Sequence, residues 1–389
     1  MVILLFLIFI LSPIVALPFS VIGLYRNCNR KAAYGYILII SASLSVIAYH
    51  IEPEFGWDVY QYYMRMRQMQ SLSTLEAAKN AIEGFQVEPI SYLLMFLISK
   101  TGKFGLYPAI STFFTYFTCL SVTCSIGVHR SYSKKNVRLM LLILVTWLAS
   151  DAIFSGIRYN MAYTFFVLAL FTEYTNNKCI AFAFYVCALL THASITLFIV
   201  LRILLPFSRN SRFFRNSLFI LMSFWSVFFG PIENLLSKFT FFNTGYIASK
   251  VSTYSYVQSG GSLGVYIVRY DRLFLCLTIA LFLFFYLNRD LSKTNKDPEI
   301  LGAQVGFLVF GSFNRLIYIA RFFQVFAALT PFFIIEFLNK ISDKTIKVFV
   351  LLFIMFSSLV LFYNQLSVFE IELNVSFLQL LMPTGWLFG

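Results

Sequence analysis

The chain has 389 residues, of which 59% are hydrophobic and 12% are charged, and its formal net charge is +13. Repeated apolar runs with so few charges exclude two soluble domains. They predict an all-α, polytopic integral membrane protein that forms a single transmembrane domain over residues 1–389. The positive charge does not predict a nucleic-acid partner, because the basic residues lie in short connectors between apolar runs, where they set orientation.

Apolar runs that end at charged or turn-forming residues predict the helices of the chain. In order, they span about 1–22, 33–49, 90–100, 104–128, 139–156, 159–174, 179–191, 194–206, 217–236, 270–287, 300–320, 322–338 and 347–366. The first run has no basic start and no small-residue cleavage site, so we expect it to be retained as a membrane span. Together the runs predict about 12 crossings with both termini outside.

The run 90–100 is the exception in this count, because a transmembrane helix needs about 20 residues. We predict a re-entrant or tilted half-helix there. It would open at Glu88-Pro89, where proline suits the first helical position and an acid favours the positive end of the helix.

Basic residues between the helices predict the orientation of the chain. They cluster at 26–31, 129–138, 209–215, 289–296 and 340–347, which we place in the cytoplasm. Two long outer, periplasmic loops remain, 50–88 and 237–268, and we expect both to form part of the active-site face. Within the first loop, residues 64–83 predict an amphipathic helix that lies on the membrane surface.

The sequence predicts neither disulfides nor a bound metal or cofactor. All six cysteines fall in helices or in connectors that we place inside. The chain also contains no nucleotide-binding loop, zinc signature or dinucleotide fingerprint.

The predicted topology brings ionisable residues together on the outer face. They are Glu52, Glu54, Asp58, Glu88, Asp151, Arg158, Asp271, Arg272 and Arg321. Because ionisable groups are costly near hydrocarbon, a shared rim of them predicts a functional site.

Residues 52–63 open the first outer loop with acids and aromatic residues, among them Asp58 and Tyr62. Carboxylates accept hydrogen bonds from sugar hydroxyls, and aromatic faces pack on pyranose rings, so the segment favours carbohydrate binding. An interfacial aromatic belt with solvated acids explains it equally well, and both interpretations stay open.

Asp151 and Arg158 lie seven residues apart, which corresponds to two turns on one face if Gly156 does not break the helix. They fit a structural ion pair that closes a helical hairpin. Arg158 also suits phosphate binding, because a guanidinium stays charged and matches phosphate oxygens bidentately.

His192 ends one predicted helix just before Ser194 begins the next. A helix-end histidine is often a structural hydrogen-bond donor. Its titration near neutral pH would also suit a general base, so a catalytic and a structural role both stay open.

Four further arginines and an acid lie near the outer face. Arg269, Asp271 and Arg272 close the second outer loop, and Arg315 and Arg321 flank a predicted turn. Basic residues are unusual on this face, which favours a role in substrate binding, whereas snorkelling to lipid headgroups would be the structural alternative.

Five short motifs in this order resemble the EpsG-like branch of the Wzy-type polysaccharide polymerases. They are Gly56-x-Asp58 with Tyr62, Glu88-Pro89 at a helix start, the segment from Gly156 to Ala162 that contains Arg158, His192-Ala193-Ser194, and Arg321 ten residues before Pro331. The likeness covers roughly residues 50–335.

The resemblance implies an enzyme of the bacterial inner membrane, with a metal-independent active site that faces the periplasm. Such an enzyme moves a growing glycan from undecaprenyl pyrophosphate to a hydroxyl of the next lipid-linked repeat unit, in O-antigen or related polysaccharide synthesis. Its partners would be that lipid-linked oligosaccharide, membrane lipid and a protein that regulates chain length.

The resemblance points to Asp58, Arg158, His192 and Arg321 as catalytic residues. The residues expected to bind substrate around them are Tyr62, Glu88, Asp151, Arg269, Arg272 and Arg315. Without a metal, arginines would hold the negative charge that develops on the pyrophosphate, and His192 or Asp58 would help the acceptor hydroxyl.

Two other functions stay open at this point. A different polytopic glycosyltransferase, using polyprenyl-phosphate sugars or acting as an O-antigen ligase, would also place acids in the first outer loop. A flippase or transporter of lipid-linked oligosaccharides would need charged residues along a path on both sides of the membrane midplane, whereas the charges here crowd one rim.

Overall fold

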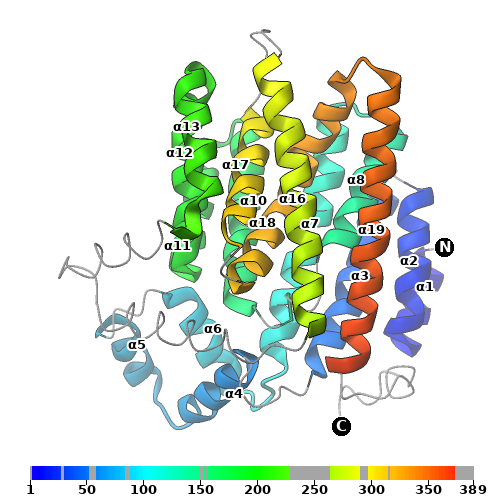
Figure 1. Cartoon of the computed structure of the whole chain (residues 1–389). Coiled ribbons are helices and arrows are strands. Elements are labelled where there is room, and N and C mark those ends of the chain that lie inside the picture. The colour runs from blue at the N-terminus through cyan, green and yellow to red at the C-terminus, as the bar shows by residue number, and fades with distance from the viewer. Residues whose placement is uncertain are drawn as a thin grey trace. The chain divides into compact units, whose positions relative to one another are not determined.

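The computed structural model describes residues 2–27, 30–51, 58–83, 88–148, 153–154, 156–227, 263–289, 297–313 and 316–372, and the regular elements of these ranges are all helical (Figure 1). Six segments are long and apolar enough to cross a membrane: Ala32–Tyr49, Leu106–His129, Ala193–Asn210, Asp271–Asn288, Tyr318–Lys340 and Lys344–Tyr363. The predicted class, an all-α multi-pass membrane protein, is confirmed. The number of about 12 crossings and the outer position of the loops stay predictions.

The contacts divide the chain into two units, Met1–Ile199 with Gln365–Gly389, and Val200–Asn364. In the first unit, α3 (Arg30–Tyr49) packs against α7 (Leu106–His129), and α10 (Ile157–Tyr174) packs against both α7 and α11 (Lys178–Thr191). These helices match four of the predicted runs closely.

The first predicted helix, 1–22, is wrong as a single element. The structure has α1 (Val2–Leu11) and α2 (Pro13–Arg26), and the two pack against each other. Pro13 lacks the N–H that would continue α1, and the Ser12 hydroxyl accepts from the N–H of Val15 at 3.4 Å, which starts a new helix.

The predicted surface helix 64–83 is also two helices, α4 (Asp58–Met69) and α5 (Thr74–Glu83). The N–H of Glu76 donates to Ser73 Oγ at 3.2 Å, while the N–H of Ser73 donates to Glu76 Oε2 at 2.7 Å. This reciprocal capping box starts α5, and the Ser73 N–H lowers the pKa of the Glu76 carboxyl. Its position on the membrane stays a prediction.

The short helix predicted at 90–100 is present as α6 (Pro89–Ser99), which has 11 residues. It packs against α4, α5, α7 and α11. Its length agrees with a half-helix, while the re-entrant path stays a prediction.

The predicted helix 139–156 is wrong at its end, because α8 (Lys134–Trp147) stops before an extended Leu148. The hydroxyl of Tyr116 donates to the Leu148 carbonyl at 3.2 Å. Gly156 then lies outside the helices as the N-cap of α10. Asp151 and Arg158 therefore do not share a face of one continuous helix, and Asp151 itself lies outside the described residues.

The second unit contains most of α12 (Thr196–Asn210), then α13 (Arg212–Ser223), α16 (Leu263–Arg289), α17 (Asp297–Gly311) and α18 (Leu316–Lys340). α17 packs against α13, α16 and α18. The predicted helix 217–236 does not run unbroken, because α13 ends at Ser223 and its C-cap, Phe224, leaves helical geometry. Residues 228–236 lie outside the described part of the chain.

The predicted break at residue 321, between helices 300–320 and 322–338, is also wrong. The break follows Gly311, where a Cβ would lie 1.9 Å from the carbonyl oxygen of Met222, so only glycine allows this close approach to α13. Arg321 therefore lies inside α18 rather than beside the turn.

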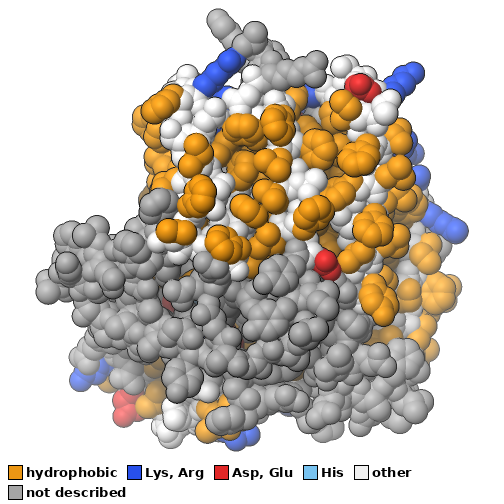
Figure 2. All heavy atoms as spheres, in the orientation of Figure 1, with side chains coloured by type: hydrophobic (Ala, Val, Ile, Leu, Met, Phe, Trp, Pro, Cys, Tyr) orange, Lys and Arg blue, Asp and Glu red, His pale blue; other side chains and the backbone are white. Residues whose placement is uncertain are grey.

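Helix α19 (Lys344–Glu372) exposes a long row of hydrophobic side chains, including Phe349, Phe356 and Phe362. In the view of Figure 2, hydrophobic side chains cover most of the described surface, and Lys and Arg lie towards its margins. This pattern is typical of helices that contact lipid.

Candidate functional site

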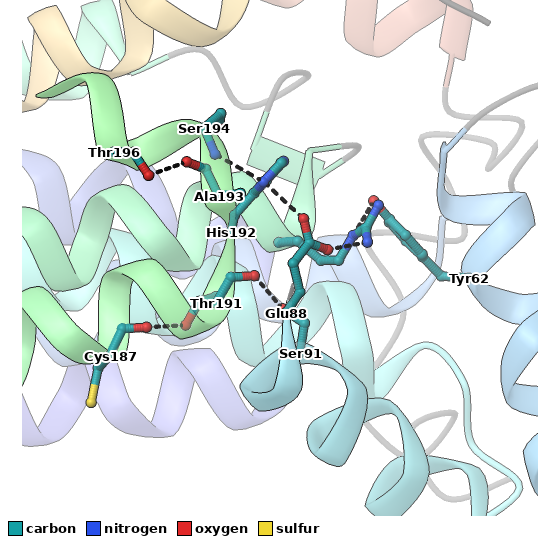
Figure 3. Close-up of polar contacts among 10 residues, drawn as sticks. Tyr62, Glu88, Ser91, Cys187, Thr191, His192, Ala193, Ser194 and Thr196 are labelled. Carbon is teal, nitrogen blue, oxygen red and sulfur yellow. Dashed lines mark hydrogen bonds and ion pairs between the residues drawn. The ribbon is translucent and has the colours of Figure 1, made fainter. Parts of the chain in front are cut away.

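The first unit holds a buried polar cluster around Glu88, the N-cap residue of α6. Only 5% of Glu88 is exposed. Pro89 fixes the first helical position, so the carboxylate stands at the positive end of α6. Figure 3 shows this carboxylate between His192 on one side and Tyr62 on the other.

Arg158, which is 7% exposed, contacts Glu88 and Tyr62. Its Nη1 donates to Glu88 Oε2, and its Nε donates to the Tyr62 hydroxyl at 3.0 Å. The guanidinium also lies over the Tyr62 ring, 4.9 Å from its centroid. Arg158 is the second residue of α10 and Tyr62 lies in the second turn of α4, so the contact joins three helices.

His192 completes the cluster through the other oxygen of Glu88. His192 Nδ1 lies 2.9 Å from Glu88 Oε1, and the residue has extended backbone between the end of α11 and a short 3-10 turn, Ala193–Ile195. The Ser194 N–H lies 3.5 Å from the same Nδ1. The same Nδ1 cannot donate to Glu88 and accept from Ser194, and we assign the ring proton to Nδ1 because its contact with the carboxylate is the shorter one.

Two hydrogen bonds from serine hydroxyls to backbone carbonyls join the helices next to His192 and Arg158. The buried Ser91 hydroxyl, one turn into α6, donates to the carbonyl of Thr191 at 3.0 Å, next to His192. The Ser111 hydroxyl of α7 donates to the carbonyl of Ile157 at 3.1 Å, next to Arg158. His192 and Arg158 therefore each follow a residue whose carbonyl is hydrogen-bonded to a neighbouring helix.

Aromatic rings surround the cluster. Tyr62 contacts Tyr107 edge to face with centroids 5.5 Å apart, and Tyr159 contacts the His192 ring in the same way at 5.9 Å. These rings belong to a well-packed region in which Tyr107 and Tyr159 are buried. They exclude water, which strengthens the interactions of the charged groups inside.

The chemistry available to the cluster follows from its charges. Glu88 compensates the charge of Arg158 and orients His192 through Nδ1, which leaves the lone pair of the neutral imidazole on Nε2. A buried ion pair contributes little net stability, so its presence in an apolar chain favours a functional role. The arrangement can take up a proton at His192 and stabilise the resulting imidazolium.

Four predicted site residues therefore come together in the first unit: Tyr62, Glu88, Arg158 and His192. Asp58 is the first residue of α4, one turn before Tyr62 and on the same side of the helix, and its side chain is half-buried.

The remaining predicted residues are distributed differently. Arg272 of α16 and Arg321 of α18 lie in the second unit, where Arg272 is buried with its guanidinium 5.6 Å from the centre of the Phe323 ring. Asp151 and Arg315 lie outside the described residues, as do Glu52 and Glu54, and the side chain of Arg269 is not described.

Sequence reasoning named Glu88 as a helix start and a substrate contact, but missed that it bridges Arg158 and His192. The two contacts span 70 and about 100 residues of chain, and no local pattern predicts such pairings. The pinning residues Ser91, Thr191 and Ser111 were missed for the same reason. Within the described ranges, no group of three or more His, Cys, Asp or Glu residues could hold a metal ion.

Comparison with known proteins gives one match. The model of the EpsG family matches residues 36–379, which include every residue of the cluster. No curated protein and no solved structure was found to match the chain.

Proposed function

The chain belongs to the EpsG family, which is associated with polysaccharide polymerases, and we propose that it polymerises lipid-linked oligosaccharide repeat units in the bacterial inner membrane. The growing glycan would leave undecaprenyl pyrophosphate and join a hydroxyl of the next repeat unit at the periplasmic face. The observation that carries the proposal is the buried contact of Glu88 with both Arg158 and His192.

In the proposed step, the acceptor hydroxyl attacks the anomeric carbon of the growing glycan. A new carbon–oxygen bond forms as the bond from the anomeric carbon to the pyrophosphate oxygen breaks, and the electron pair of that bond leaves with the pyrophosphate. The hydroxyl proton moves to His192 Nε2. Pyrophosphate is a good leaving group, so the site needs cations more than a general acid.

Glu88 would support this step as the partner of His192. Its carboxylate lies 2.9 Å from Nδ1, which fixes the ring and stabilises the imidazolium when Nε2 takes the proton. The imidazolium would then release its proton from Nε2 to solvent, which restores the neutral base for the next addition.

Arg158 would contribute positive charge for the pyrophosphate. The contacts with Glu88 and Tyr62 use Nη1 and Nε, which are only part of the five-donor fork of a guanidinium. Glu88 would compensate the charge of Arg158 before substrate binds, and the other guanidinium donors would then contact the pyrophosphate. Arg272 and Arg321 remain proposed pyrophosphate ligands, and Asp58 remains a proposed contact of the sugar acceptor.

The test is a reaction with one synthetic undecaprenyl-pyrophosphate-linked repeat unit and purified full-length protein. A ladder of products that differ by one repeat supports the proposal. A single addition product would favour another transferase or a ligase, and movement across a vesicle membrane without any new bond would favour a flippase. In cells, deletion should leave glycans capped with single repeats.

Substitution of His192 tests whether polymer formation depends on the cluster of Glu88, Arg158 and His192. His192→Gln keeps a polar side chain of similar length but removes the base. We therefore expect the rate at which the ladder products form to fall by about 10²–10⁴-fold. The matched control is His129→Gln, whose histidine ends α7 and contacts Tyr174 instead of the cluster. Equal rates for both variants would remove His192 from the mechanism.

A further inference from the structure

Tyr107, the second residue of α7, carries a hydroxyl that the proposed mechanism does not use. The residue is fully buried, and within the described part of the chain its hydroxyl has no hydrogen-bond partner. A buried hydroxyl without a partner costs free energy, because it has lost its hydrogen bonds with water. A group of this kind is a candidate for ligand binding where it lies at a functional site.

Tyr107 lies at the cluster of Glu88, Arg158 and His192. Its ring contacts the ring of Tyr62 edge to face, with centroids 5.5 Å apart. Electrostatic interactions also connect Tyr107 with both Arg158 and Glu88. Glu88 and Tyr62 already hold the Arg158 guanidinium through hydrogen bonds, so Tyr107 is a neighbour of this guanidinium that still has a proton to donate.

The first turn of α7 fixes the position of Tyr107. Gly105, the N-cap of α7, lies so close to the end of α3 that a Cβ would clash with the carbonyl oxygen of Tyr49. The N–H of Tyr107 donates to the carbonyl of Phe104 at 3.0 Å. The hydroxyl is therefore held in place before any ligand binds, as electrostatic stabilisation of a transition state requires.

Ser91 of α6 provides the structural alternative for this hydroxyl. The two hydroxyls are neighbours, but they do not form a hydrogen bond of regular length and angle. The Ser91 proton is directed to the carbonyl of Thr191, so Ser91 could only accept from Tyr107. If that were the role of the Tyr107 hydroxyl, its removal would weaken the fold and leave the reaction rate unchanged.

We propose that the Tyr107 hydroxyl donates a hydrogen bond to a phosphate oxygen of the anion that binds at Arg158. A phenol in this site stays neutral, because burial of a phenolate would be costly, so it keeps its proton. The hydrogen bond becomes stronger as negative charge develops on the leaving pyrophosphate, and no proton is transferred from Tyr107. The proposal rests on the proposed function for the identity of the anion.

Fluorine NMR tests this contact without any glycan. Tyr107 is replaced by 3-fluorotyrosine in the full-length protein in nanodiscs, and farnesyl diphosphate is added as a short polyprenyl diphosphate. We expect a saturable change in the fluorine chemical shift. Farnesol, which has the same hydrocarbon and no phosphate, should leave the chemical shift unchanged. No change with farnesyl diphosphate, or an equal change with farnesol, would overturn the proposal.

Tyr163 of α10 provides the matched control for the label. It is also fully buried, and its hydroxyl also lacks a hydrogen-bond partner among the residues that the structure describes. Its neighbours, however, include Thr115 and Cys119 in the interior of α7 rather than the charged residues of the cluster. A 3-fluorotyrosine at position 163 should therefore not respond to farnesyl diphosphate, and equal responses at both positions would overturn the proposal.

Phenylalanine variants distinguish a functional hydroxyl from a structural one. Tyr107→Phe should lower kcat for ladder formation by about 10²-fold and change KM much less, because the donor acts on charge that develops in the transition state. Its midpoint of thermal unfolding should stay the same or rise, since an unpartnered buried hydroxyl is removed. Tyr163→Phe should unfold in the same way and keep the full rate. A lower unfolding midpoint with an unchanged kcat in Tyr107→Phe would assign the hydroxyl to Ser91 and overturn the proposal.

Failure of the proposed function would give a different result. If the unsubstituted protein forms no ladder but the label at position 107 responds to farnesyl diphosphate, the polymerase activity is excluded and the Tyr107 contact stands. If the ladder forms at the same rate with and without the Tyr107 hydroxyl, the polymerase activity stands and the role of Tyr107 is excluded.

Discussion

Glu88 Oε1 lies 2.9 Å from His192 Nδ1, while the other oxygen of the same carboxylate contacts the guanidinium of Arg158. One acid thus connects the start of α6, the start of α10 and the end of α11. It couples the orientation of a potential base to the charge of a potential anion ligand, so its removal should affect both activity and stability.

Glu88→Gln is the most direct test of this coupling. The amide keeps the shape and can still accept from Nδ1, but it cannot stabilise an imidazolium and leaves Arg158 without its counter-charge. We expect the product ladder to slow by about 10²-fold or more, and the unfolding free energy to fall by about 3–5 kcal/mol because a buried charge is uncompensated.

Glu173→Gln is the matched control, since Glu173 lies near the other end of α10 and accepts a hydrogen bond from Tyr185 at 2.8 Å. It should change the rate little. A full rate for Glu88→Gln, measured by the product ladder, would contradict the role of the carboxylate.

A double variant separates stability from catalysis. Adding Arg158→Gln to Glu88→Gln removes the uncompensated charge. Thermal unfolding should therefore show that the double variant regains most of the stability lost in Glu88→Gln alone. The rate should not recover, because neither the imidazolium partner nor the pyrophosphate ligand is restored. Recovery of both would show that the pair is structural only.

Part of this cluster was accessible from sequence. Glu88, Arg158 and His192 were each chosen from local features: an acid before a helix-starting proline, an arginine seven residues after an acid, and a histidine between two helices. Their mutual contact was not, because it depends on how α6, α10 and α11 pack. One of the two interpretations paired Arg158 with Asp151. That pairing required one continuous helix through both residues, but α8 ends at Trp147.

Errors in helix boundaries have a similar origin. The runs 1–22 and 64–83 contain strong local start signals, Ser12-Pro13 and Ser73 with Glu76, that a count of apolar residues ignores. The misplaced break at 321 arose because an arginine interrupts an apolar run, although a charged residue does not end a helix. Helix α17 ends at Gly311, where the close approach of the Met222 carbonyl leaves no room for a side chain, and no sequence pattern shows this tertiary contact.

Tyr62→Phe tests the hydroxyl of α4 separately from its ring. The variant loses the acceptor for Arg158 Nε at 3.0 Å but keeps the ring beside the guanidinium and Tyr107. We expect the loss of this hydrogen bond to weaken substrate binding by about 1 kcal/mol. The substrate concentration needed for half-maximal rate should then rise about fivefold. Tyr185→Phe, outside the cluster, is the control for removing a tyrosine hydroxyl, and steady-state kinetics would compare the two.

Lys100, at the end of α6, binds the C-terminal end of α4, the end away from Tyr62. Its ammonium donates to the carbonyl of Gln70 at 2.8 Å and also contacts the carbonyls of Met69 and Leu72, where α4 ends. Helix α4 is thus tied to α6 through Lys100 and to α10 through the contact of Tyr62 with Arg158, which in turn contacts Glu88 at the start of α6. We therefore expect Lys100 to help position Tyr62, although its ammonium binds carbonyls at the other end of α4.

Lys100→Met keeps much of the hydrocarbon stem over the Phe96 ring and removes the charge-assisted hydrogen bonds, worth about 1.5–3 kcal/mol in total. We expect amide hydrogen exchange to rise over residues 66–76 and the rate to fall severalfold, because Tyr62 is held less firmly. Lys100→Arg should restore part of both, since a guanidinium can reach the same carbonyls. Lys103→Met, an exposed change three residues away, should alter neither, and exchange that stays slow in Lys100→Met would show that α4 does not depend on this lysine.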